Sequence, residues 1–374
     1  MYADHLVQPW LEAVLDGLPS RDIFDAHTHI GQHDPSGFTA QLDELVDALA
    51  AVDARAAVFP LAEPDDGYRE ANRACLEAAS EHPDRLVAFL RLTPNDPRAV
   101  VEEGLAAGAR GLKLHLSSDE FDLDDPGLEH IYEIAHDQRL PVIVHAGPEG
   151  GSVGHQALAV CRRWPRLRLV LAHCALTDIG WLWRHVDETP NLFFDTAWWT
   201  PAQLLALFRL VPPGRILNAS DLPYSTPLSH TMSTARCAWQ AGLDPDQIVG
   251  VIGGQFARLV ESAEPLDLGS APAGEARPLS PLLEVISTNL LTSLEALQRG
   301  DEPGVGLDVA RHACRVPHDD PDAEVIASVK RLLDLYDEHG PRIPRRNQFR
   351  PGWDLVAAAA VVARTPAAPL PADG

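Results

Sequence analysis

The sequence has very little lysine. Only Lys113 and Lys330 occur in 374 residues, and arginine supplies all the other positively charged side chains. Aspartate and glutamate number 54, which gives a net charge of -24. Nucleic acids and anionic membranes both bind to basic patches, so we expect neither as a partner. With so few lysines in the chain, the position of each one is informative.

Several other features are missing. The five cysteines are scattered without a Cys-x-x-Cys pair, which is typical of free thiols in a reducing compartment. No apolar run approaches the roughly 20 residues needed to cross a membrane. The N-terminal residues lack the basic start and apolar run of a secretory signal. We therefore expect a cytoplasmic globular protein, in agreement with 45% apolar and 22% charged residues.

Short apolar segments alternate with longer amphipathic ones between Ile23 and Val260. Segments such as Val142–Val144 and Leu169–Leu171 are apolar on both faces, as expected for parallel strands covered by helices. The expected strands are 23–26, 56–61, 86–92, 111–115, 141–146, 167–173, 192–196 and 215–220. Eight strand–helix units predict an α/β fold, a (β/α)8 TIM barrel. A doubly wound sheet is the alternative, but no Gly-x-Gly-x-x-Gly follows the first strand.

The composition changes after Val260, where Ala, Pro, Gly and acidic residues become frequent and helical patterns then follow. We expect a barrel with an appended C-terminal helical segment. The predicted divisions are an N-terminal helical lead-in (1–21), the barrel (22–262), a linker (263–280), the helical segment (281–364) and a disordered tail (365–374). The helical segment could cap the barrel mouth or mediate association, and a homo-oligomer is compatible with either role.

Two histidines lie one residue apart in the stretch Phe24–Ile30, at the end of the first expected strand. Alternate side chains of a strand share a face, so His27 and His29 should point the same way. Two converging neutral imidazoles suit a divalent metal such as zinc. Alone, however, a His-x-His pair is as well explained by two surface histidines.

Further polar residues follow the other strands at the ends that form the active-site face of a barrel. The fifth and sixth strands end in His145 and His173, and the eighth is followed by Asp221. A buried imidazole needs a hydrogen-bond partner, so repeating this placement on three strands is difficult to explain by packing. The pattern therefore predicts a metal centre.

The order of these residues resembles that of the amidohydrolase superfamily. More closely, it is similar to the branch of metal-dependent TIM-barrel hydrolases that includes aminocarboxymuconate-semialdehyde decarboxylase. The matching stretches are 24–29, 111–115, 141–147, 171–174 and 220–223, and 253–259 resembles the end of that branch's barrel, with Gln255 in place of an asparagine. The resemblance covers residues 22–262, and the helical segment has no counterpart in it.

The resemblance implies roles for these residues. His27, His29, His145 and Asp221 would hold one divalent metal ion, most simply Zn2+, next to a water molecule. Asp221 would act as general base. His173 would either bind a second metal ion or orient the substrate and stabilise an oxyanion.

Lys113 and His115 share a face of the fourth strand in Gly-Leu-Lys-Leu-His. This string resembles the urease strand in which the lysine is carbamylated and bridges two metals, while the histidine contacts substrate. A similar string occurs in the mononuclear branch, so a cationic lysine or an ion pair is also open. We favour one ion, with Lys113 and His173 as candidate ligands for a second.

Four residues are candidates at the periphery of the site. Arg91 could clamp a substrate carboxylate or form an ordinary ion pair. Asp195 could support a ligand histidine, and Trp198 and Tyr224 could line the substrate pocket or belong to the core. The acidic run Asp119–Asp125 is expected to be a solvated loop.

The leading interpretation is a metal-dependent hydrolase that cleaves an amide, ester or lactone bond of a small molecule, including aromatic or carboxylated ones. The alternative is a metal-dependent, non-oxidative decarboxylase of a small aromatic or unsaturated acid. A second alternative, from a different class, is a non-catalytic metal-binding scaffold.

Overall fold

The computed structural model describes residues 3–35, 37–62, 67–274, 276–345 and 347–372. Residues 1–2, 275 and 373–374, which belong to the expected lead-in, linker and tail, lie outside the described residues. Within the described ranges, no helix is long and apolar enough to cross a membrane.

Eight parallel strands follow one another around the barrel, each paired with the next in the chain. They are β1 (Phe24–Ile30), β2 (Arg55–Pro60), β3 (Leu86–Arg91), β4 (Gly111–Leu114), β5 (Pro141–Val144), β6 (Arg168–Leu171), β7 (Leu192–Asp195) and β8 (Ile216–Leu217). The predicted barrel is confirmed. Because apolar side chains face both the interior and the helices, the strands are buried along nearly their whole length.

Backbone hydrogen bonds close the barrel between the residues that follow β8 and β1. The Ala26 N–H donates to the Asn218 carbonyl (2.8 Å), the Asp221 N–H to the His27 carbonyl (2.8 Å) and the His29 N–H to the Leu222 carbonyl (2.9 Å). The seam therefore extends past the short β8 to the carboxyl end of β1.

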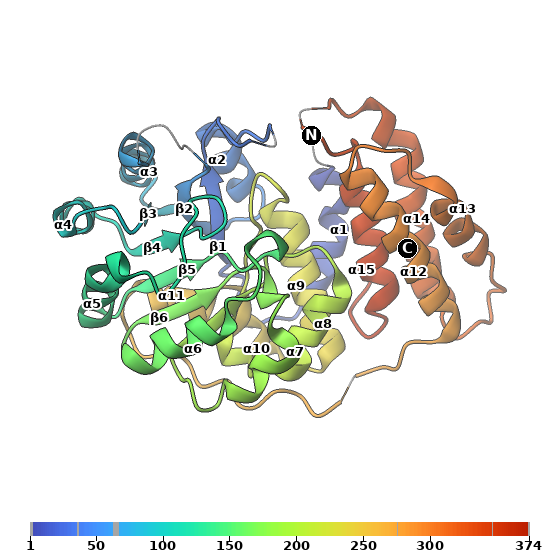
Figure 1. The fold of residues 1–374 in the computed structure, drawn as a ribbon. Helices are drawn as coiled ribbons and strands as arrows, with labels where there is room; N and C mark the ends of the chain where they lie inside the picture. Colours follow the sequence, from blue (N-terminus) through green and yellow to red (C-terminus); the bar gives the residue numbers. More distant parts are fainter. Residues whose placement is uncertain (1–2, 36, 63–66, 275, 346, 373–374) are drawn as a thin grey trace.

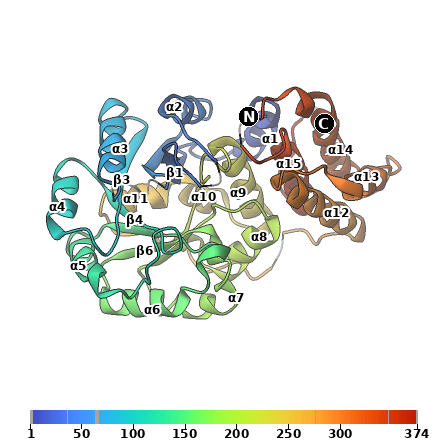
Figure 2. The same ribbon diagram turned by 45° about the horizontal axis from the view of Figure 1, so that its top comes forward.

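Helices surround the barrel (Figures 1 and 2). They are α2 (Leu42–Ala50), α3 (Arg69–Glu81), α4 (Arg98–Ala106), α5 (Glu129–Gln138), α6 (Gly154–Arg163), α7 (Ile179–Leu182), α8 (Pro201–Leu210) and α9 (Pro227–Ala241), followed by the short α10 (Pro245–Val249) and α11 (Gln255–Val260). The Phe256 ring of α11 lies 4.8 Å from that of Phe24 at the start of β1, so α11 closes the amino-terminal end of the barrel. Phe59 belongs to the same interior cluster as Phe24 and Phe256, and its ring centroid lies 5.0 Å from that of His27.

The described residues of the C-terminal segment include the α-helices α12 (Pro281–Gln298), α13 (Gly304–Ala313), α14 (Ala323–His339) and α15 (Trp353–Arg364). The N-terminal helix α1 (Asp4–Leu15) lies between this segment and the barrel (Figure 1). Its Trp10 indole donates to Ser328 of α14 (2.7 Å), and its Val14 carbonyl accepts from Trp239 of α9 (3.1 Å). The helix thus binds the two parts together.

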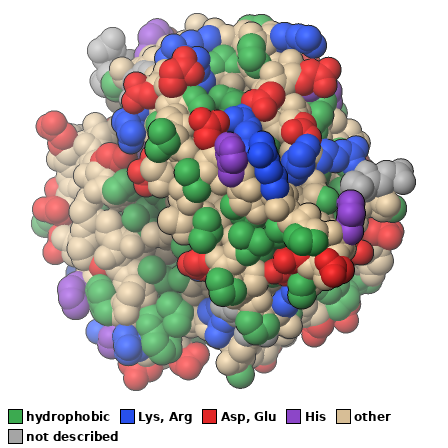
Figure 3. Space-filling model, turned by 90° about the vertical axis from the view of Figure 1, so that its right-hand side faces the viewer, with side chains coloured by type: hydrophobic (Ala, Val, Ile, Leu, Met, Phe, Trp, Pro, Cys, Tyr) green, Lys and Arg blue, Asp and Glu red, His purple; other side chains and the backbone are tan. Residues whose placement is uncertain are grey.

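The outward face of the C-terminal segment is chemically mixed. Apolar side chains lie there among acidic and basic ones (Figure 3). Val285, Val305 and Val309 are large apolar side chains with substantial exposure.

The start of the expected disordered tail is held against the barrel helix α9. Arg236 of α9 is fully buried and donates to the Thr365 hydroxyl (3.0 Å), the Thr365 carbonyl (3.1 Å) and the Pro369 carbonyl (2.8 Å). Residues 365–372 therefore differ from the expectation. Proline-rich composition indicated disorder, but a buried guanidinium needs acceptors, and this segment supplies them.

Replacing Arg236 by alanine should lower the free energy of unfolding by about 3 kcal/mol, because it leaves a cavity and removes the donor for three acceptors. Urea denaturation measures this change, and limited proteolysis should detect new cleavage within residues 365–372. Arg73→Ala is the matched control, because Arg73 is an exposed arginine with surface ion pairs. Unchanged protease resistance of the tail in Arg236→Ala would contradict the assignment.

Candidate metal centre

The seam that closes the barrel places Asp221 beside both histidines of β1. Its Oδ1 lies 3.0 Å from His27 Nε2 and 3.1 Å from His29 Nε2. The two imidazoles are buried, and the Asp221 side chain is 16% exposed toward a cavity. Of the four predicted metal ligands, the structure brings these three together at the carboxyl end of the barrel.

Local backbone irregularities aim these side chains. The register between β1 and β2 shifts between Asp25 and Thr28, where β1 carries one extra residue. Such bulges re-aim side chains beside active sites, and His27 lies within this one. Asp221 has a φ of 59° and His173 a φ of 56°, a left-handed conformation that is uncommon for residues with a Cβ.

The hydrogen bonds of the two β1 histidines determine which ring nitrogens carry the protons. His27 Nδ1 lies 2.8 Å from the Asp195 carboxylate, and His29 Nδ1 lies 3.2 Å from the Pro60 carbonyl. A carbonyl can only accept and an ionised carboxylate can only accept, so each Nδ1 is the donor. In the neutral rings, both Nε2 lone pairs then point at Asp221 Oδ1. Three acceptor atoms therefore meet at one point, and such an arrangement requires a cation or a proton.

The electrostatics of the group agree with this requirement. Burial and the Lys113 cation oppose protonation of His27, but the carboxylates of Asp221 and Asp195 outweigh them and raise its pKa. Burial alone would raise the pKa of Asp221, yet its contacts with His27 and His29 hold that pKa well below the usual range. Burial lowers the pKa of His29 to about 4. Burial thus keeps His29 neutral, whereas the raised pKa of His27 and the lowered pKa of Asp221 indicate that the carboxylates favour positive charge at the meeting point.

A divalent metal fits this donor set. Atoms of His27, His29 and Asp221 lie within 4.8 Å of one another, and imidazole nitrogen with carboxylate oxygen is a ligand combination suited to zinc. Asp195 would orient His27 as a ligand, because its Oδ2 accepts from His27 Nδ1. Its Oδ1 is itself held in place by the backbone N–H groups of His173 (2.8 Å) and Ala197 (3.0 Å). Such hydrogen bonds orient a ligand histidine.

His145 lies in a second group, next to His173. His173 Nδ1 lies 2.7 Å from the Ala197 carbonyl and must donate to it, so its Nε2 accepts from His145 Nδ1 (3.1 Å). His145 Nε2 is thereby left as a lone pair without a hydrogen-bond partner in the described part of the chain, with Glu149 at 3.5 Å. The ring of His115 stacks on that of His145 at 4.0 Å. This orphaned nitrogen is also suited to a metal or a proton.

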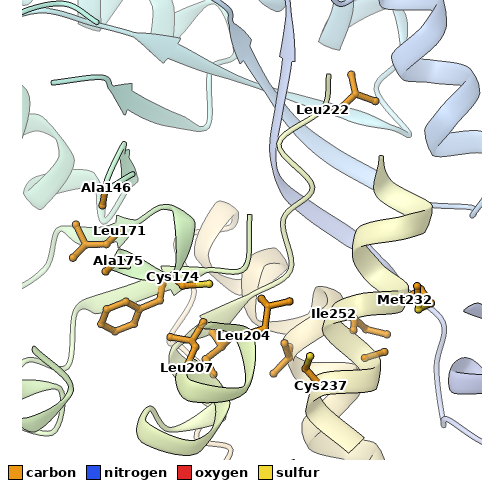
Figure 4. Close-up of a cluster of buried hydrophobic side chains, with 14 of the residues drawn as sticks. Ala146, Leu171, Cys174, Ala175, Leu204, Leu207, Leu222, Met232, Cys237 and Ile252 are labelled. Atoms are coloured by element: carbon orange, nitrogen blue, oxygen red, sulfur yellow. The ribbon is translucent and has the colours of Figure 1, made fainter. Parts of the chain in front are cut away.

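The turn that carries His173 is held by packing against the hydrophobic core. Cys174 and Ala175 follow it with positive φ values and belong to the same buried cluster as Leu204 and Leu207 of α8 (Figure 4). The left-handed turn is therefore anchored in the core while His173 faces the cavity.

Lys113 is buried beside the candidate metal centre. Its Nζ lies 3.3 Å from His27 Nε2 and 4.9 Å from the centroid of the Phe59 ring. Burial lowers the pKa of Lys113 to about 8, although Asp221 and Asp195 act in the opposite direction. The rare lysine that the sequence singled out is therefore in direct contact with the candidate centre.

Arg91 lines the cavity but is engaged by a carboxylate. Its Nε and Nη2 donate to the two oxygens of Asp119 (3.1 and 3.0 Å), and Asp119 also accepts from the Tyr68 hydroxyl (2.6 Å). Asp119 was expected in a solvated loop, but its side chain is 6% exposed. The sequence left an ion pair of Arg91 open but did not identify Asp119 as the partner, because the two residues are 28 positions apart.

A cavity of about 640 Å3 opens above the centre. Its walls include the predicted residues Trp198, Tyr224, His115 and Arg91. Trp198 stacks on Trp199 at 3.9 Å, and the Tyr224 hydroxyl donates to Asp34 (2.7 Å). Sequence reasoning did not identify the lining residues from the C-terminal segment, namely Glu295, Gln298, Arg299, Gln348 and Phe349.

The comparisons with known proteins bear on the barrel and its fold. A family model described as amidohydrolase matches residues 24–248, which include the barrel strands and exclude α12–α15. An uncharacterised TIM-barrel protein from Bordetella bronchiseptica is 17% identical, with a TM-score of 0.51 over 64% of this chain and 99% of that one. 4-Oxalomesaconate hydratase from Rhodopseudomonas palustris is 16% identical, with a TM-score of 0.51 over 64% of this chain and 96% of that one. No curated protein matches the chain.

Asp195→Asn should weaken zinc binding about 10–100-fold while the fold is retained. The asparagine oxygen can still accept the two backbone N–H groups, but its NH2 would face His27 Nδ1 and move the imidazole proton to Nε2. Competition with a chromophoric chelator measures the zinc affinity. Asp178→Asn is the matched control, because Asp178 is also buried and accepts backbone N–H groups, at Val153 and Gly154. Equal zinc affinity in the wild type and Asp195→Asn would contradict the proton assignment.

Proposed function

Because this chain belongs to the amidohydrolase family, we propose that it is a metal-dependent hydrolase that cleaves an amide, ester or lactone bond of a small molecule. The observation that carries the proposal is the convergence of two imidazole lone pairs and one carboxylate oxygen at the floor of a cavity. Fold likeness at 16–17% identity supports only the barrel.

We propose that His27, His29 and Asp221 hold one zinc ion. His145 lies outside this close group, but it lines the same cavity with an unpartnered Nε2 in the described part of the chain and is the candidate fourth ligand. When bound, the ion would polarise the scissile carbonyl and lower the pKa of water in the site toward neutrality. One ion is favoured because, within the described ranges, a single close group of potential ligands is found.

Asp221 is suited to move the proton. Its pKa lies well below the usual range, so it is ionised at neutral pH, and part of its carboxylate reaches the cavity. It would accept a proton from the attacking water and deliver it to the leaving group as general base and then general acid.

Lys113 and His173 would assist the reaction in two different ways. The Lys113 amine supplies N–H donors beside His27 and could stabilise negative charge that develops on the substrate. His173 donates to the Ala197 carbonyl and accepts from His145, so its proton pattern fixes the ring of His145. We therefore assign His173 to positioning His145 and contacting the substrate.

The cavity suits a small molecule. A volume of about 640 Å3 lies in the range of ligand pockets. The stacked Trp198 and Trp199 offer an apolar wall, and Tyr224 and His115 offer polar atoms around the rim.

Elemental analysis of the purified protein tests the metal assignment. We expect His27→Ala and Asp221→Ala to lose bound metal to background while their circular dichroism remains that of the wild type. His312→Ala, at an exposed histidine of α13, should keep its metal. Stoichiometric metal in both site variants would refute the assignment.

Turnover tests the reaction class. Metal-loaded protein should hydrolyse members of a panel of nitrophenyl esters, lactones and anilides, and Asp221→Asn should lower kcat about 100-fold or more. Release of carbon dioxide from dihydroxybenzoate-type acids without ester or lactone cleavage would instead establish the decarboxylase. Absence of both reactions in metal-loaded protein would favour the non-catalytic scaffold.

A further inference from the structure

The C-terminal segment forms part of the cavity wall, and one of its residues has a buried side-chain nitrogen without a hydrogen-bond partner in the described part of the chain. Gln298, the last residue of α12, lines the cavity and is 8% exposed. Its Nε2 has no hydrogen-bond partner among the residues that the structure describes. An unpaired buried amide lowers stability, because its bonds to water are lost without replacement.

This wall is held rigidly against the barrel. The Phe349 ring lies 4.9 Å from Phe38 in the β1–α2 loop, and Phe38 lies 4.5 Å from Tyr224. The Arg350 N–H donates to the Leu297 carbonyl (2.8 Å), which fixes the last turn of α12 to the segment before α15. Gln298 is thus held beside the cavity by packing that continues to Tyr224, whose ring centroid lies 6.3 Å from that of His29.

The surroundings of Gln298 favour a neutral acceptor over an anion. The carboxyl end of α12 carries the negative end of the helix dipole, and Glu295 lies one turn earlier on the same rim. Arg299, the next residue, also lines the cavity, and the Asp301 carboxylate 3.5 Å from its Nε offsets its positive charge. A carbonyl oxygen can satisfy the amide without introducing a second negative charge.

We propose that Gln298 is a specificity-determining residue that donates a hydrogen bond to a neutral carbonyl oxygen at the end of the substrate remote from the metal centre. The inference rests on the proposed function, because it takes the reacting end of the substrate to lie at His27, His29 and Asp221. The substrate class is then a small molecule with a second, uncharged oxygen acceptor, such as a carboxamide. A site built around such a hydrogen bond discriminates against analogues that lack the acceptor.

Binding of inert probes to the zinc-loaded full chain tests this proposal by isothermal titration calorimetry. The probes are matched sets of straight-chain acids that end in a methyl, a carboxamide or a carboxylate group: pentanoate, glutaramate and glutarate, with the hexanoate and heptanoate sets as longer rulers. At one chain length or more, the carboxamide-ended acid should bind about tenfold more tightly than the methyl-ended acid.

Two variants of α12 separate specificity from stability. Gln298→Met, similar in shape but without a donor, should reduce the carboxamide advantage to less than about twofold and leave the methyl-ended acid unchanged. Its Tm without ligand should equal or exceed that of the wild type, because an unpaired buried amide has been removed. Ser293→Ala is the matched control, since Ser293 Oγ is likewise buried without a hydrogen-bond partner in the described ranges and does not line the cavity.

Three results would overturn the inference: no carboxamide advantage at any length, an advantage that survives in Gln298→Met, or tighter binding of the carboxylate-ended acids. Because binding needs no bond cleavage, these failures are distinct from failure of the hydrolase proposal. Hydrolysis without a carboxamide advantage refutes only this inference. An advantage without hydrolysis refutes only the proposed reaction.

Discussion

Closure of the barrel between β8 and β1 is the constraint on which the site depends. The backbone bond from Asp221 to the His27 carbonyl holds the seam, and the same contact brings the Asp221 carboxylate to both β1 histidines. A barrel with an open seam would leave these side chains apart, because Asp221 is 192 positions from His29. Fold and site are therefore stabilised by the same short stretch of backbone.

The electrostatics of the centre follow from burial. His27 and His29 are oriented by acceptors on their Nδ1 atoms, so their Nε2 lone pairs and the Asp221 carboxylate face one another. In a buried site this mutual repulsion is costly unless a cation or a proton occupies the meeting point. Asp195 extends the arrangement by linking His27 to the turn that carries His173. The centre is thus one connected network in which each proton position depends on its neighbours.

The C-terminal segment changes the mouth of the barrel into a walled cavity. α1 binds the segment to α9, and the Phe38–Phe349 contact brings it against the β1–α2 loop. The amidohydrolase family match ends before this segment, yet residues of the segment line the cavity. Under the proposed function, α12 would contribute to substrate selection together with the barrel loops, and the strand ends would carry the chemistry.

The sequence by itself determined the eight strands, the appended helices and the placement of His27, His29, His173 and Asp221 at strand ends. These features follow from the periodicity of apolar residues, which neighbouring residues reveal, and from the general rule that barrel strands end at the active-site face. Only the tertiary structure decided that His145 pairs with His173, that Arg91 is engaged by Asp119, that residues 365–372 pack on α9 and that Gln298 lines the cavity. Each of these is a contact between side chains distant in sequence, chosen by packing and by the need of buried polar groups for partners, and no local pattern encodes it.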